Sequence, residues 1–160
     1  MIRALVSVAL LSFFVSSVAV AQSGTKSTPE ERRSWAATLH KIEANPLDER
    51  VQDEAAHAAN RLKDVDDVVI SPCGIFAELP NKCNKSWGVV IYLLGLSAYQ
   101  VETGKGDSAG ENLYALRSVL KAYASAIATD SKLRNKQLDT LSKMDADGKL
   151  PDLMAKDNCQ

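Results

Sequence analysis

The chain is poor in the residues that most often mark a chemical site. Of its 160 residues only two are histidines and three are cysteines, and aromatic residues make up 6%. Positive and negative side chains nearly balance, with 19 Lys and Arg against 20 Asp and Glu. A surface for nucleic acid needs a dense excess of basic residues, because neutralised phosphates release their counterions. The charge balance therefore argues against a nucleic-acid partner.

Familiar catalytic motifs are also missing from the sequence. It contains no G-x-S-x-G, no H-E-x-x-H and no C-x-x-C, the patterns of serine hydrolases, zinc proteases and dithiol redox proteins. Gly104-Lys105-Gly106 lacks the G-x-x-x-x-G-K-[ST] spacing of a phosphate-binding loop. We therefore predict no cofactor and no catalytic residue. An enzyme whose site is assembled from residues distant in the sequence stays an alternative.

What the chain does have at its start is the pattern of a secretory signal peptide. Arg3 supplies a positive charge, residues 4–21 are uncharged and mainly apolar, and Ala19-Val20-Ala21 is a small-x-small cleavage pattern. An uncleaved anchor is the alternative, but the abrupt change to polar residues after Ala21 favours cleavage. We predict a secreted or periplasmic protein without a membrane span after cleavage, with a signal peptide (1–21), a flexible start (22–27) and one helical domain (28–160).

Apolar spacing predicts an all-α fold. Thr28-Pro29-Glu30-Glu31 is the pattern of a helix start with a capping box. A second capping box is expected from Ser108 to Glu111, and Asp130 or Ser131 is expected to cap the helix that follows. A strand over residues 89–94 is the alternative to a buried helix there. We expect a single compact bundle of five to six helices, over about residues 29–44, 47–63, 87–102, 108–129, 131–145 and 150–156.

Residues 64–86 break the helical pattern and predict an extended piece followed by a long loop. Cys73 and Cys83 bracket this loop, and in an oxidising compartment they are the favoured disulfide pair. A bridge from either of them to Cys159 is the alternative. The cysteine that remains would be free or would join two chains in a dimer.

The same loop contains a candidate contact surface for a partner. Ile75, Phe76 and Leu79 are its apolar residues, and if they are exposed they form a patch of the kind that marks interaction sites. If they dock onto the helices instead, the loop is only a structural lid. The sequence alone does not distinguish the contact surface from the structural lid.

Two short patterns resemble parts of metal sites. Glu54-x-x-His57 has the spacing found in di-iron helical bundles, and His40-x-x-Glu43 is its reverse on the neighbouring helix. At 100° per residue both histidines fall on the solvent side of their helices, so no metal site is predicted. Asp145-x-Asp147-Gly148 matches part of a calcium loop but lacks the first ligand and the bidentate Glu. A turn that ends a helix is the preferred interpretation.

The order of features resembles that of small secreted bacterial proteins with one all-helical domain. The likeness rests on a Trp35-x-x-x-Leu39 first helix, a valine-rich segment from Val65 to Cys73, and a long helix over Leu113 to Ile127. The resemblance implies an exported helical domain. It carries no activity and no site residues.

These observations favour an exported binding module for an unidentified protein or peptide. The first alternative is a carrier of a small ligand, with a pocket between the helices over residues 87–99 and 113–127. Four tyrosines on those helices would supply hydroxyl groups to it, namely Tyr92, Tyr99, Tyr114 and Tyr123. The second alternative is the enzyme without a familiar motif.

Overall fold

Six α-helices account for most of the residues that the computed structural model describes, which are 25–75 and 87–156. Within these ranges there is no strand, so the predicted all-α fold with five to six helices is confirmed. Two short 3-10 turns accompany the helices, η1 (Leu62–Asp64) and η2 (Ser131–Leu133). The helices are α1 (Pro29–Ala44), α2 (Glu49–Arg61), α4 (Trp87–Thr103), α5 (Ser108–Thr129), α6 (Lys136–Ala146) and α7 (Leu150–Lys156).

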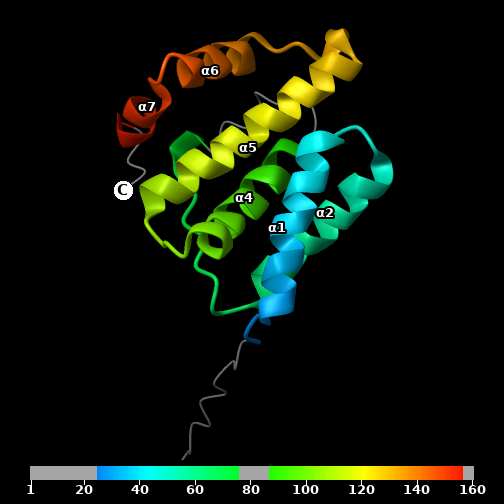
Figure 1. The fold of residues 1–160 in the computed structure, drawn as a ribbon, viewed down its shortest axis with the longest axis vertical. Helices are drawn as coiled ribbons and strands as arrows, with labels where there is room; N and C mark the ends of the chain where they lie inside the picture. The colour runs from blue at the N-terminus through cyan, green and yellow to red at the C-terminus, as the bar shows by residue number, and fades with distance from the viewer. Residues whose placement is uncertain (1–24, 76–86, 157–160) are drawn as a thin grey trace, which may run out of the picture.

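Four helices form a packed body, and the last two form an arm on its outside (Figure 1). In the body, which consists of α1, α2, α4 and α5, the central helix α4 packs against the other three. α1 and α2 are joined by a short connection and form an antiparallel hairpin. The C-terminal arm, α6 and α7, packs on α5 and on itself. The body therefore contains the main core, and the arm covers one side of one helix.

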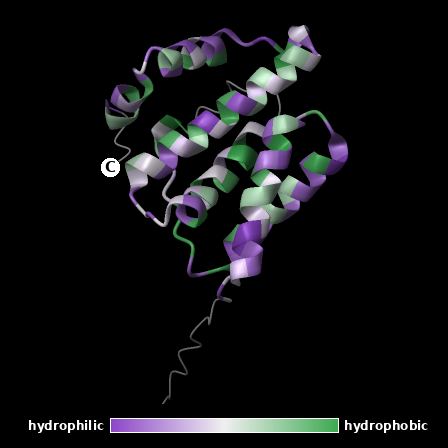
Figure 2. Ribbon diagram, in the orientation of Figure 1, coloured by the Kyte–Doolittle hydropathy of each residue, from purple (hydrophilic) through white to green (hydrophobic). Residues whose placement is uncertain are grey.

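Residues 87–103 form a helix, α4, so the alternative strand over residues 89–94 is not formed. α4 is buried on most sides. Its residues Ile91, Leu94 and Leu96 are fully buried, and Figure 2 shows hydrophobic (green) residues on this helix. Gly95 faces Ala115 of α5 so closely that an added Cβ would lie 2.6 Å from the Cα of Ala115. The two helices are in direct backbone contact there, and a ligand has no room between them at that level.

The first two helices begin at capping side chains. The hydroxyl Oγ1 of Thr28 accepts from the N–H of Glu31 at 3.1 Å, and Oε2 of Glu31 accepts from the N–H of Thr28 at 2.8 Å. The predicted capping box is therefore confirmed. α2 begins two residues later than the predicted Leu47, because Asp48 caps it by accepting the N–H of Arg50 at 2.9 Å.

α5 begins at a different cap from the one predicted. Oδ1 of Asp107 accepts from the N–H of Gly110 at 2.7 Å, so the capping box expected from Ser108 to Glu111 is wrong. Glu111 is buried and turned toward α4, where its Oε1 accepts from Nε2 of Gln100 at 2.9 Å. Packing against α4 thus draws the carboxylate away from the helix start.

α6 also begins later than expected. Asp130 caps only the short turn η2, and Asn135 caps α6 by accepting the N–H of Gln137 at 2.9 Å. The helix ends at Ala146, shortly before Gly148, whose φ of 69° is the left-handed conformation that glycine adopts most easily. The predicted helix stop at this glycine is confirmed.

The start of the described chain is held against residues 65–67. Thr25 forms an isolated parallel bridge with Val65, and the N–H of Ser27 donates to Oδ1 of Asp67 at 2.9 Å. Nη2 of Arg32 donates to Oδ2 of Asp67 at 2.9 Å. The Ser27 N–H and the Arg32 guanidinium together lower the pKa of Asp67 to about 2. Thr25 and Ser27, expected in the flexible start, are therefore attached to the body, because Asp67 binds this stretch.

Candidate functional site

The four tyrosines expected around a ligand pocket lie in different surroundings. Tyr92 is fully buried and donates its hydroxyl to Asn112, whereas the hydroxyl of Tyr123 binds the C-terminal arm. Only Tyr99 and Tyr114 come together, with ring centroids 5.9 Å apart. The structure thus brings two of the four side chains close to each other, and each hydroxyl has a partner within the protein.

Asn112 is the centre of a buried polar cluster that was not predicted from the sequence. Its Oδ1 accepts from the N–H of Cys73 at 2.9 Å and from the hydroxyl of Tyr92 at 2.5 Å. Its Nδ2 donates to the carbonyl oxygens of Ser71 at 3.0 Å and Ser108 at 2.8 Å. The hydrogen-bonding groups of the carboxamide are all used. Asn112 therefore fastens residues 71–73 to the body and leaves nothing for a ligand.

The cysteine bridge lies at the edge of the described chain. Cys73 is disulfide-bonded, but Cys83 and Cys159, the two cysteines that could pair with it, lie outside the described residues. The pairing of Cys73 with Cys83 therefore stays a prediction. The same holds for a dimer through the remaining cysteine.

The expected contact surface of the loop is described only at its first residue. Ile75 is 5% exposed and belongs to the core, so it is not available to a partner. Phe76 and Leu79 lie outside the described residues. A surface formed by all three residues is excluded because the first of them packs inward.

The side chains of the two patterns that resemble metal sites are exposed or pair with other residues of the protein. Both histidines are exposed, as their helical positions predicted. Asp145 accepts from Nε of Arg117 at 2.8 Å, and a carboxylate oxygen of Asp147 lies 3.6 Å from Nζ of Lys149. In the part of the chain that the structure describes, no group of three His, Cys, Asp or Glu side chains could hold a metal ion.

One of the histidines joins two carboxylates from different helices. Nδ1 of His40 lies 2.9 Å from Oε2 of Glu43, one turn further along α1. Nε2 lies 2.8 Å from Oε1 of Glu102, near the end of α4. Tyr114 of α5 donates its hydroxyl to Oε2 of Glu102 at 2.6 Å. We call His40, Glu43 and Glu102 the His40 bridge, which connects α1 to α4 and, through Tyr114, to α5.

The His40 bridge favours a protonated imidazole. Both ring nitrogens face carboxylate oxygens, and only the imidazolium donates from both nitrogens. The hydrogen bond to Glu43 raises the pKa of His40, burial opposes it, and the contact with Glu102 raises it further. Burial and the Glu102 carboxylate raise the pKa of Tyr114, which keeps its hydroxyl a donor. Because both nitrogens are occupied, the bridge is not arranged as a general base.

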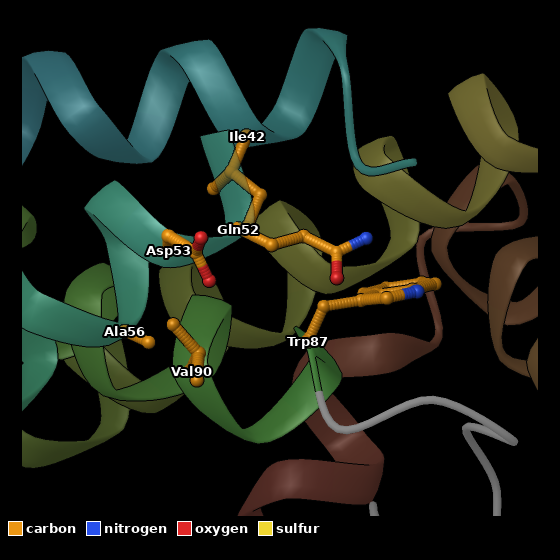
Figure 3. Close-up of a pocket in the computed structure, with 6 residues that line it drawn as sticks. All are labelled: Ile42, Gln52, Asp53, Ala56, Trp87 and Val90. Atoms are coloured by element: carbon orange, nitrogen blue, oxygen red, sulfur yellow. The ribbon is translucent and has the colours of Figure 1, made fainter. Parts of the chain in front are cut away.

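A hollow of about 130 Å³ opens between α1, α2 and α4 (Figure 3). In Figure 3 the carboxamide of Gln52 lies over the indole of Trp87, and the carboxylate of Asp53 lies on the other side of the hollow. Nε2 of Gln52 donates to the carbonyl oxygen of Pro46 at 2.7 Å, which fixes this side chain. We call this site the Trp87 hollow; it is lined by Ile42, Gln52, Asp53, Ala56, Trp87 and Val90.

Two polar groups of the Trp87 hollow, the Asp53 carboxylate and the Trp87 indole N–H, have no hydrogen-bonding partner among the described residues. Among the described residues the side chain of Asp53 accepts no hydrogen bond and forms no ion pair, and it is exposed at the protein surface. The indole N–H of Trp87 is buried and has no acceptor within residues 25–75 and 87–156. The hollow therefore combines apolar walls with a carboxylate that is open to a cation.

A second, larger groove of about 380 Å³ lies between α1 and α2. Its charged groups are already paired: Nε of Arg61 lies 3.1 Å from Oε1 of Glu31, and Nζ of Lys41 lies 2.7 Å from Oε1 of Glu54. Burial of a ligand here would have to break these pairs. The Trp87 hollow is therefore the better candidate for a site. The groove is lined by Glu31, Ser34, Trp35, Thr38, Glu54, His57, Ala58 and Arg61.

Comparison of the chain with protein-family models, with curated proteins and with solved structures found no match. Within residues 25–75 and 87–156, no helix combines the length and the apolar composition needed to cross a bilayer. The Trp87 hollow is therefore a candidate binding site on its geometry alone. No residue that lines the Trp87 hollow was predicted from the sequence as a site residue. In the His40 bridge, the sequence indicated His40 and Glu43 through their spacing, whereas Glu102 had no signal of its own.

Proposed function

We propose that the chain is an exported, non-catalytic binding module for a protein or peptide, and that the Trp87 hollow receives a basic side chain of that partner. The signal-peptide pattern of residues 1–21 supports a place in the periplasm or outside the cell. The observation that carries the binding proposal is the unpartnered carboxylate of Asp53 beside a hollow with apolar walls.

The chemistry of the hollow matches the side chain of lysine. Long basic side chains bury their methylene stems on apolar surface while the charged head stays near water. Ile42, Ala56 and Val90 offer such a surface, and Asp53 lies where an ammonium group would reach solvent. Pockets for whole small molecules occupy roughly 300–1,000 Å³, so a hollow of about 130 Å³ fits one side chain better.

Binding of a lysine peptide tests the proposal directly. The probe is an acetylated and amidated pentapeptide with lysine between glycines, titrated into ¹⁵N-labelled mature protein while the indole N–H signal of Trp87 is followed by NMR. We expect a saturable shift of this signal. Asp53→Asn should weaken the apparent affinity by about two- to fivefold, the range for an exposed ion pair.

Two controls separate this site from general charge attraction. The same peptide with norleucine in place of lysine keeps the alkyl chain and removes the ammonium group, so it should bind more weakly. Asp152→Asn removes an exposed carboxylate in α7 and should leave the titration unchanged. Equal shifts with lysine and norleucine, or an Asp53→Asn variant that binds as the wild type does, would contradict the proposed site.

A further inference from the structure

We propose that the His40 bridge is a pH-sensitive tether between α1 and α4, closed when the imidazole is protonated and opened at Glu102 when it is neutral. The inference does not depend on the proposed function. It rests on one imidazole that lies within 2.9 Å of carboxylates from two helices.

A neutral imidazole cannot keep both contacts of the bridge. It carries one N–H and one lone pair. In either tautomer, the lone pair would face a carboxylate oxygen at less than 3 Å, from Glu43 or from Glu102. Loss of the proton therefore requires one of the two contacts to lengthen.

The surroundings decide which contact opens. The Glu43 side chain is 10% exposed, and its one described ion pair besides that with His40 is a longer one, with Nζ of Lys121 at 3.7 Å from Oε1. Release of this buried carboxylate would leave its charge poorly solvated. The Glu102 side chain is 33% exposed and also holds the hydroxyl of Tyr114, so it can turn to water. The remaining N–H should therefore stay on Glu43, and the contact between α1 and α4 should open.

The direction of the pH effect follows from the raised pKa of His40. A group whose pKa is higher in the folded protein adds stability that is complete below its unfolded pKa, here near 6.5. That stability is lost as the pH rises through the higher, folded value. The lysine nearest along the helix, Lys41, is engaged by Glu54 at 2.7 Å and does not replace the lost proton.

An NMR titration of the His40 ring tests the tether. In the His57→Gln variant the only remaining imidazole signal is that of His40, and we expect its midpoint above 6.5. Glu102→Gln should lower this midpoint. The matched control is Glu30→Gln, which lies ten residues earlier on α1, about 15 Å along the helix axis. It should leave the midpoint where it is.

A double-mutant cycle measures whether the coupling between His40 and Glu102 depends on pH, which a purely structural contact would not show. His40→Gln, Glu102→Gln and the double variant are compared by urea unfolding at pH 5.5 and pH 8.5. The coupling between the two sites should change the unfolding equilibrium constant by about two- to fivefold at pH 5.5 and should vanish at pH 8.5. Equal coupling at both pH values, or a His40 midpoint at or below 6.5, would overturn the proposal.

Discussion

The body and the C-terminal arm are both helical, but they are held in different ways. In the body, α4 is surrounded by α1, α2 and α5, whereas the arm packs on α5 and on itself. Each region nevertheless has a completely buried leucine: Leu94 of α4 is 0% exposed and Leu138 of α6 is 1% exposed. The two leucines are therefore equally buried, but Leu94 lies among more neighbouring helices than Leu138 does.

Polar contacts complete the attachment of the arm. The hydroxyl of Tyr123 in α5 accepts the N–H of Asn135 at 2.8 Å and donates to Oδ1 of Asp139 at 2.8 Å. Nε of Arg117 donates to Oδ1 of Asp145 at 2.8 Å. Regions with few partner elements open at lower free energy than the global core. We infer that the arm opens from α5 without unfolding of the body.

Leu94→Ala should have the largest effect, because it removes a side chain from the centre of the body. Truncation of a buried leucine costs about 2–5 kcal/mol, and we expect a value near the upper end because the four packed helices leave little room to collapse. The whole chain should be destabilised together. Urea unfolding followed by circular dichroism measures the free energy, and hydrogen exchange should rise in all helices.

Leu138→Ala makes the same chemical change in the arm and should cost less, about 2–3 kcal/mol, because α6 can shift on α5 to fill the cavity. Faster hydrogen exchange should be confined to α6 and α7, with α4 protected as before. If Leu138→Ala instead raises exchange equally in α4, the arm and the body form a single cooperative unit and the distinction between them is wrong.

The helices could be predicted from the sequence because their signals are local. The capping box at Thr28, the apolar spacing in each helix and the stop at Gly148 each depend on residues within a few positions. The caps of α5 and α6 were predicted wrongly. There, several polar residues in a row could serve as a cap, and contacts from distant residues decided among them, as Gln100 does for Glu111.

The His40 bridge could be predicted only in part, because its contacts join residues that are far apart in the sequence, and no residue of the Trp87 hollow was predicted as a site residue. The spacing of His40 and Glu43 was visible, but Glu102 lies 62 residues from His40. Asn112 did have a weak local signal, since it shares a helix face with the buried Leu116 and Val119. A polar residue on an apolar face indicates a buried hydrogen-bonded group, but its partners come from three other parts of the chain.

Tyr123→Phe should have the smallest of these effects and tests whether the polar contacts hold the arm. The change keeps the buried ring and removes one hydroxyl, which leaves the N–H of Asn135 without the acceptor it has at 2.8 Å. The loss should be about 1 kcal/mol and should appear as faster hydrogen exchange at the start of α6, with no change in α4. Tyr99→Phe is the matched control, since its hydroxyl binds Asp107 outside the arm. Equal exchange in α6 for the two variants would mean that apolar packing alone attaches the arm to α5.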